Sequence, residues 1–122
     1  MSDFETLSDE ILENVAGGGF EGSEHTTVVT DANFGRFING ANVVVLFGVS
    51  WSNTCVRASE LIEECAAKYR NFRVGVFEIT NNEYIKYKQG IKNVPTTIRY
   101  QFGTEVNRVE GWQRITNLFH GK

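Results

Sequence analysis

The stretch VVVLFGVSWSNTC, from Val43 to Cys55, joins a continuous apolar run to a short polar turn. Between Val43 and Val49 no side chain is polar or charged, which is typical of a strand buried on both faces of a sheet. After the turn, small and apolar side chains recur every three or four residues, and this stripe predicts an amphipathic helix that extends to about Tyr69. The members of the stripe are Cys55, Ala58, Ile62, Cys65 and Tyr69. A serine, Ser52, and a cysteine, Cys55, therefore lie where a buried strand passes into a helix.

The remaining chain continues this alternation of strand and helix patterns. Apolar and β-branched runs predict strands, and short segments with apolar residues at helical spacing predict helices. The predicted strands are Thr26–Thr30, Phe72–Ile79, Thr96–Phe102 and Glu105–Glu110, and the predicted helices are 31–41 with Asp31 as N-cap, Glu83–Gln89, and a terminal helix after Gly111. The order β-α-β-α-β-α-β-β-α predicts a three-layer α/β/α fold, in which helices cover both faces of a central mixed sheet.

Composition excludes several classes of function. The chain has 122 residues, with 12 basic and 15 acidic side chains and a net charge of −3, and no cluster of Lys or Arg, so nucleic acid is not an expected partner. No run approaches the roughly 20 apolar residues of a membrane span, and no general secretory signal is present. Two cysteines and two separated histidines, His25 and His120, do not make a zinc pattern. We expect no metal and no cofactor, and both histidines are expected to be solvated.

The first 22 residues differ from the rest of the chain. They are acidic, and they end in a run of three glycines at 17–19. Their apolar residues have helical spacing and are Phe4, Leu7, Ile11, Leu12 and Val15. Each glycine costs about 1 kcal/mol relative to alanine inside a helix, so the glycine run ends the pattern. The sequence therefore predicts an N-terminal helical extension with a hinge at residues 1–22, followed by one domain at 23–122.

The element order, the W-x-x-x-C pattern and the only proline, in GIKNVPTTIRY, together resemble the thioredoxin family. The resemblance covers roughly Thr27 to Phe119 and includes VTDANFGRFI near its start and GTEVNRVEG near its end. It implies a thioredoxin-like fold with a cis peptide bond before the proline, and a shallow groove that binds an extended peptide or protein partner. The residues that it implies for this groove are Trp51, Val94, Pro95, Gly111 and Trp112.

The departures from the family pattern concern its chemistry. The resemblance places Ser52 at the nucleophilic cysteine and Cys55 at the resolving cysteine of C-x-x-C. It also aligns the family's buried aspartate with Leu46 and the accompanying lysine with Val76. A serine hydroxyl cannot form a disulfide, so Ser52 and Cys55 cannot cycle between dithiol and disulfide. The sequence therefore predicts a thioredoxin-like protein without dithiol redox activity, which acts as a binding or accessory factor.

Alternative roles remain for the serine and the cysteines. Ser52 can be an N-cap whose oxygen accepts the backbone N–H of Thr54 or Cys55. Cys65 lies about 15 Å from Cys55 along a helix, too far for a disulfide, and is read as a small buried side chain. Cys55 is either inert in the core or a reactive monothiol. In the second case, the protein is a thiol-disulfide oxidoreductase or isomerase-like enzyme.

The segment LSDEILENVAGG resembles the double-glycine leaders of bacteriocins and microcins. Leu7, Leu12 and Val15 lie at the apolar anchor positions, and Gly17 and Gly18 precede the implied cut, although Ile11 replaces the usual glutamate. The resemblance implies a peptidase-containing ABC transporter as a partner. The protein would then be synthesised in the cytoplasm and exported to the periplasm or the extracellular space. The alternative is a short helix that packs on its own domain.

Overall fold

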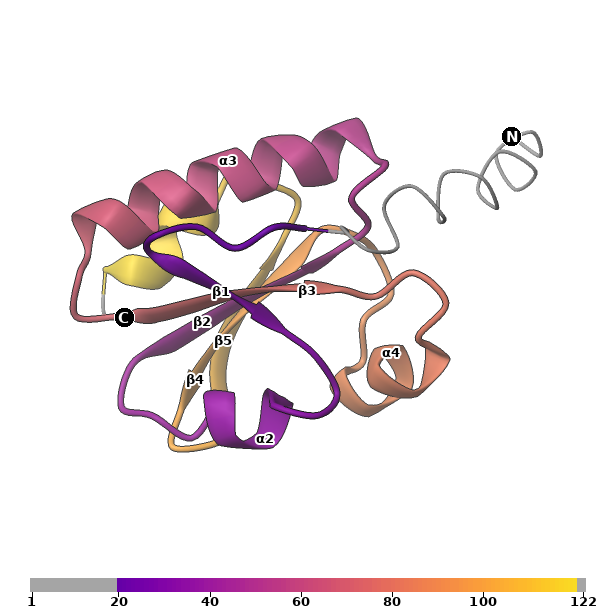
Figure 1. The fold of residues 1–122 in the computed structure, drawn as a ribbon, viewed down its shortest axis with the longest axis horizontal. Helices are drawn as coiled ribbons and strands as arrows, with labels where there is room; N and C mark the ends of the chain where they lie inside the picture. Colours follow the sequence, from indigo (N-terminus) through magenta and orange to yellow (C-terminus); the bar gives the residue numbers. More distant parts are fainter. Residues whose placement is uncertain (1–19, 121–122) are drawn as a thin grey trace.

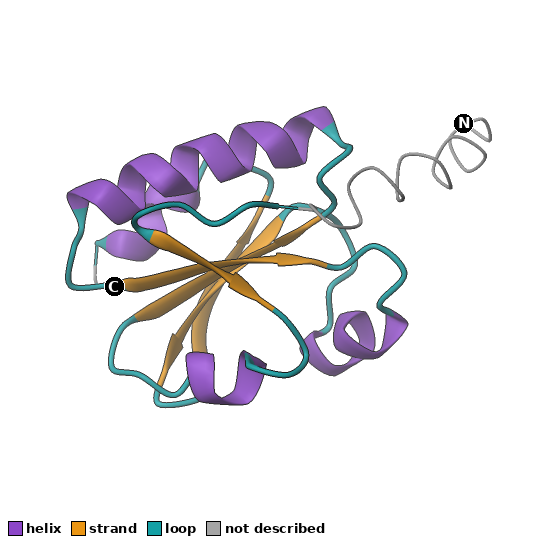
Figure 2. Ribbon diagram, in the orientation of Figure 1, coloured by secondary structure: helices purple, strands orange, loops and turns teal. Residues whose placement is uncertain are grey.

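The computed structural model describes residues 20–120, which form a five-stranded sheet with helices on both sides (Figures 1 and 2). The strands are β1 (Thr26–Val29), β2 (Val43–Gly48), β3 (Arg73–Glu78), β4 (Thr96–Gln101) and β5 (Thr104–Glu110). The helices are α2 (Phe34–Phe37), α3 (Asn53–Lys68), α4 (Glu83–Gln89) and the 3₁₀ helix η1 (Ile115–Phe119). The predicted thioredoxin-like α/β fold is therefore confirmed.

The sheet is mixed, and β2 lies at its centre. The strand order is β1-β3-β2-β4-β5; β3 is parallel to both β1 and β2, whereas β4 is antiparallel to β2 and to β5. Helix α3 and η1 cover one face, and α2 and α4 lie on the other (Figure 2). All six residues of β2 are buried, as its unbroken apolar run predicts.

Two predicted helices differ from the structure. Helix α2 is only four residues long, and its N-cap is Asn33 rather than Asp31. The carboxylate of Asp31 instead accepts two hydrogen bonds from the side-chain amide of Asn82, at 3.0 and 3.1 Å. The terminal helix is a short 3₁₀ helix that begins at Ile115. Asn82, 51 residues away in sequence, competes with the helix end for the carboxylate of Asp31. The pattern of neighbouring residues cannot reveal this competition.

The packed part of the domain reaches back to Phe20, three residues before the predicted boundary at 23. The Phe20 side chain is buried, and its ring lies 3.3 Å from the point where a Cβ on Gly48 would stand. Phe20 therefore belongs to the core of the domain. The predicted helix and the two glycines of the implied cut, Gly17 and Gly18, lie outside the described residues. No helix within 20–120 combines the length and the apolar character needed to cross a membrane.

The centre of β3 depends on a glycine. A Cβ on Gly75 would lie 2.7 Å from the ring of Phe37 and would also collide with Val29, so the missing side chain lets α2 pack directly on β3. We expect Gly75→Ala to lower the free energy of unfolding by about 1–3 kcal/mol, because an extra methyl group in a filled core forces its neighbours apart. Urea denaturation followed by circular dichroism measures this change.

Gly35→Ala is the matched control, because a Cβ on Gly35 has no neighbour within 4 Å. Alanine in α2 should leave stability unchanged or raise it by up to about 1 kcal/mol. Equal effects of the two substitutions would contradict the packing described for Gly75.

Candidate functional site

The S-x-x-C segment forms the turn between β2 and α3. The N–H of Ser52 donates to the carbonyl of Val49 at 3.2 Å and closes the turn. The carbonyl of Ser52 then accepts the first helical N–H, that of Val56, at 2.9 Å. Ser52 has extended backbone angles, φ −98° and ψ 131°, which are typical of an N-cap. Ser52 therefore occupies the N-cap of α3, as predicted.

The side chain of Ser52 does not cap the helix. Its hydroxyl lies 3.0 Å from the hydroxyl of Thr54, and it makes no hydrogen bond to a backbone N–H of the first turn. The prediction that Ser52 accepts from the N–H of Thr54 or Cys55 is therefore wrong. The neighbouring threonine hydroxyl takes the place of the backbone partner. Helix capping thus does not explain why a serine stands at this position.

Cys55 points into the core. Its side chain is fully buried, and its Sγ accepts the N–H of Val49 at 3.4 Å. Gly48 makes this approach possible, because a Cβ there would lie only 3.0 Å from Sγ. Burial raises the pKa of the Cys55 thiol, and the hydrogen bond from Val49 offsets this only in part. Cys55 is therefore a neutral thiol at physiological pH.

Beneath the turn, the sheet holds an apolar pair in place of ionisable groups. Leu46 on β2 and Val76 on β3 lie directly opposite each other in the parallel ladder, and both are buried. Neither side chain can accept or donate a proton. A single polar group here would be buried without a partner, at a cost of several kcal/mol, which a matched apolar pair avoids.

The proline segment lies at the same end of the sheet as the turn. Thr96 pairs with Phe47, so Pro95, which precedes Thr96, lies next to the carboxyl end of β2. The Val94–Pro95 peptide bond is cis. Val94 is 36% exposed, and within the described residues nothing hydrogen-bonds to its backbone. Val94 therefore lies at the surface of this end of the domain.

Gly111 and Trp112 directly follow β5 and lie at the same end of the sheet. The N–H of Gly111 donates to the carbonyl of Pro95 at 2.8 Å, and Gly111 has a φ of +83°, which favours glycine. Trp112 is partly buried against the core, and the guanidinium of Arg57 lies 4.9 Å from its ring centroid. Trp51, at the turn, is 39% exposed. The five predicted groove residues thus come from three segments that end at one edge of the sheet.

Glu78 supports the turn and was not predicted from the sequence. The N–H of Ser50 donates to both carboxylate oxygens of Glu78, at 3.1 and 3.2 Å, and the hydroxyl of Thr80 also donates to this carboxylate. Glu78 is the last residue of β3, so it holds the chain that leads from β2 to Trp51. A lone acidic residue at a strand end carries no sequence signal for such a role.

The other cysteine and the histidines lie away from this site. Cys65 is a free, buried thiol on α3, as predicted, and burial raises its pKa. His120 is exposed and its ring contacts Tyr69, with Nε2 lying 3.4 Å from the tyrosine hydroxyl, whereas His25 is half-buried. In residues 20–120, no group of three His, Cys, Asp or Glu side chains is arranged to hold a metal ion.

The comparison with known families agrees with this geometry. The family model described as thioredoxin matches residues 25–121, which include the whole sheet and every predicted groove residue. The chain belongs to the thioredoxin family. The match begins after the leader-like segment and does not include it.

Curated relatives are similar to most of this chain, and a solved structure shares its fold. A thioredoxin of Chlamydia pneumoniae is 28% identical over 96 residues, which cover 76% of this chain and 94% of the relative. A Staphylococcus aureus thioredoxin is 29% identical over 91 residues, covering 74% and 88%. The solved structure of Plasmodium falciparum thioredoxin superposes with a TM-score of 0.71 at 24% identity, covering 76% of this chain and 95% of that one.

The burial of both thiols predicts that they are alkylated slowly, at a rate that rises with pH. In the native protein, Cys55 and Cys65 should react with iodoacetamide far more slowly than in concentrated guanidinium chloride. Because burial raises the pKa of each thiol, the thiolate fraction and hence the rate should still be rising between about pH 7 and pH 9. Mass spectrometry of tryptic peptides separates the two sites. A Cys55 rate that reaches its plateau below pH 7 would instead reveal a stable thiolate.

Proposed function

We propose that this protein is a thioredoxin-fold binding or accessory factor that lacks dithiol redox activity. The observation that carries the proposal is Ser52 at the N-cap of α3, where the resemblance places the attacking cysteine. Attack on a substrate disulfide needs a thiolate at this position, and resolution of the mixed disulfide needs a second thiol. The chain offers only one sulfur in this turn, that of Cys55, and it is buried.

Two further observations support the loss of the redox cycle. The pair Leu46 and Val76 is apolar, so neither residue can accept or donate a proton where the resemblance places the family's aspartate and lysine. The carboxylate of Glu78 is engaged by the N–H of Ser50 and the hydroxyl of Thr80, so it supports the turn rather than the thiol. Its negative charge also adds to the effect of burial in raising the pKa of Cys55. These features favour a structural role for the whole turn.

The binding role is supported by the surface around the cis-proline segment. The backbone of Val94, which makes no hydrogen bond within residues 20–120, can pair with an extended peptide by β-strand addition. Exposed apolar side chains of Trp51, Val56 and Val94 lie at this end of the domain. Backbone hydrogen bonds and apolar contacts need no thiol, so this surface remains competent after the loss of Cys chemistry. We propose a peptide or protein segment in extended conformation as the partner.

The alternative enzyme is a monothiol oxidoreductase or isomerase-like protein that forms mixed disulfides through Cys55. The position of Cys55 in the first turn of α3 favours it, because helix N-termini stabilise thiolates. Full burial and the pKa of the thiol, which burial raises despite the hydrogen bond from Val49, argue against it. The binding role is therefore better supported.

For the N-terminal segment, we propose removal during export. The leader-like pattern ends at Gly18, and the packed domain includes Phe20, so a cut after Gly18 removes no residue of the described core. The recognition element would be the acidic helix pattern, read by the peptidase of an ABC transporter. Export to the periplasm or the extracellular space would follow.

Insulin reduction by dithiothreitol tests the redox proposal. The wild-type protein should not accelerate the reaction, because Ser52 cannot form a mixed disulfide. Ser52→Cys should accelerate it, because the introduced thiol would lie beside the surface that we propose to bind an extended substrate chain. The rate should stay below that of a dithiol thioredoxin, because Leu46 and Val76 cannot relay protons.

Ser52→Ala is the control, and it should be as inactive as the wild type. Turnover by the wild-type protein that disappears in Cys55→Ala would establish the monothiol enzyme. A folded Ser52→Cys variant without any activity would contradict the proposed substrate-binding surface.

Incubation with the peptidase domain of the cognate transporter tests the leader. Cutting should occur after Gly18, and Gly18→Val should block it, because a side chain cannot pass a cleft built for glycine. Removal of residues 1–18 should change the melting temperature by less than about 5 °C, equivalent to about 1 kcal/mol in a domain of this size. A larger loss of stability would show that the segment packs on its own domain. Cutting of Gly18→Val at the wild-type rate would exclude double-glycine recognition.

A further inference from the structure

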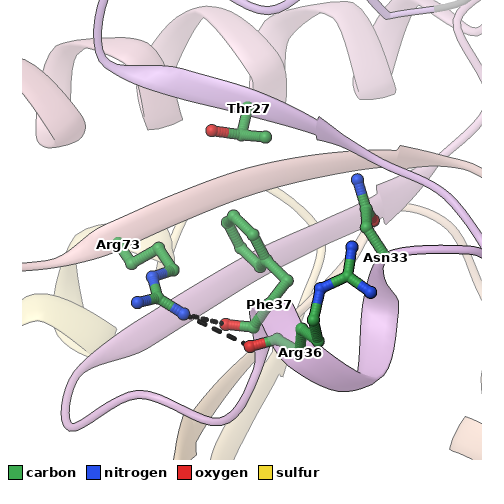
Figure 3. A pocket seen from close by; sticks show the side chains of 5 residues that line it. All are labelled: Thr27, Asn33, Arg36, Phe37 and Arg73. Atoms are coloured by element: carbon green, nitrogen blue, oxygen red, sulfur yellow. Dashed lines mark hydrogen bonds between the residues drawn. The ribbon is translucent and has the colours of Figure 1, made fainter.

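A hollow of about 310 Å³ lies between α2, β1 and the start of β3. It is lined by Thr27, Asn33, Arg36, Phe37 and Arg73, and none of these side chains is acidic. Figure 3 shows the guanidinium groups of the two arginines on either side of Phe37, with Thr27 and Asn33 along the wall. Arg73 begins β3, so the hollow lies at the opposite end of the sheet from the S-x-x-C turn.

Arg73 is held in place by contacts that use only part of its guanidinium. Its Nη1 donates to the carbonyls of Phe37 and Arg36, at 2.9 and 3.3 Å, and so satisfies the end of α2. The guanidinium also lies 5.7 Å from the centroid of the Phe37 ring, and it passes over Gly40, where a Cβ would come within 3.3 Å of it. Nε and Nη2 have no hydrogen-bond partner among the described residues. The guanidinium of Arg73 is therefore held in place, and its Nε and Nη2 groups can donate hydrogen bonds to a ligand.

The rest of the lining also consists mainly of donors. Arg36 is exposed, and within residues 20–120 its side chain forms no ion pair or hydrogen bond. The side-chain oxygen of Asn33 accepts the N–H of Thr30 at 2.8 Å, so the carbonyl of this amide is engaged. Its Nδ2 donates one hydrogen to the carbonyl of Val28 and keeps a second. Thr27 adds an exposed hydroxyl.

We propose that this hollow binds a phosphate-type oxyanion, either inorganic phosphate or a phosphate monoester. Guanidinium groups present several N–H donors in a planar fork, which matches the oxygens of a phosphate group and gives short, charge-assisted hydrogen bonds. Two guanidiniums in a hollow without a carboxylate leave their positive charge uncompensated at short range. The site is separate from the proposed peptide surface, so it does not depend on the function assigned to that surface.

Titration of the ¹⁵N-labelled full chain with sodium phosphate tests this site, with ionic strength held constant by sodium chloride. The backbone amide signals of Thr27, Gly35 and Phe37 should shift in a saturable way. Arg36→Gln should weaken binding about tenfold, as expected for the loss of a charge-assisted contact. A parallel titration with phenyl phosphate separates the sources, because tighter binding of the ester indicates a phosphorylated ligand and tighter binding of the free ion indicates phosphate itself.

Arg114→Gln is the matched control, since Arg114 is also exposed but lies in a different hollow, beside Glu110 and Gln113. It should leave the phosphate affinity unchanged. Retained signal dispersion establishes that both variants are folded. Shifts that are linear, or that chloride reproduces at equal ionic strength, would overturn the proposal. Equal weakening by the two substitutions would also overturn it, because binding would then follow net charge alone.

Discussion

The burial of β2 between β3 and β4 is the constraint on which the rest of this structure depends. Six consecutive buried residues from Val43 to Gly48 require a covered sheet on both faces, and α3 on one side and α2 on the other provide that cover. Parallel pairing with β3 and antiparallel pairing with β4 bring the carboxyl end of β2 next to the start of β4. The turn with Ser52 and the cis peptide at Pro95 meet there as a direct consequence of strand order.

The same packing buries the Cys55 thiol at this end of the sheet but leaves Val94 exposed. Gly48 lets the Cys55 sulfur sit inside the core, where burial keeps the thiol neutral. Ser52 occupies the outer position with a hydroxyl that cannot exchange with a disulfide. Val94, before the cis proline, nevertheless remains exposed at the surface. The binding surface that we propose at this end of the sheet therefore does not depend on a sulfur atom at position 52.

Periodicity and residue type were sufficient to predict the strands, the long helix and the mixed sheet. These features follow from apolar spacing within a single element, such as the stripe from Cys55 to Tyr69. The positions of Ser52, Leu46 and Val76 relative to the family's chemistry were implied by the resemblance to thioredoxins, and periodicity alone does not give them. The prediction made helix α2 too long. The helix spans only Phe34–Phe37, and Gly35 and Gly40 disfavour a longer one.

The supporting contacts of the site depend on residues far apart in the chain. Glu78 holds the N–H of Ser50, which lies 28 residues earlier, and Asp31 bonds to Asn82 rather than to its own helix. Phe20 enters the core beside Gly48 although it directly follows a glycine run that reads as a hinge. Local pattern contains no information about such pairs, because a carboxylate or a ring takes the best partner that the assembled sheet brings within reach. Only the closed fold decides which side chains stabilise the turn and which remain available for a ligand.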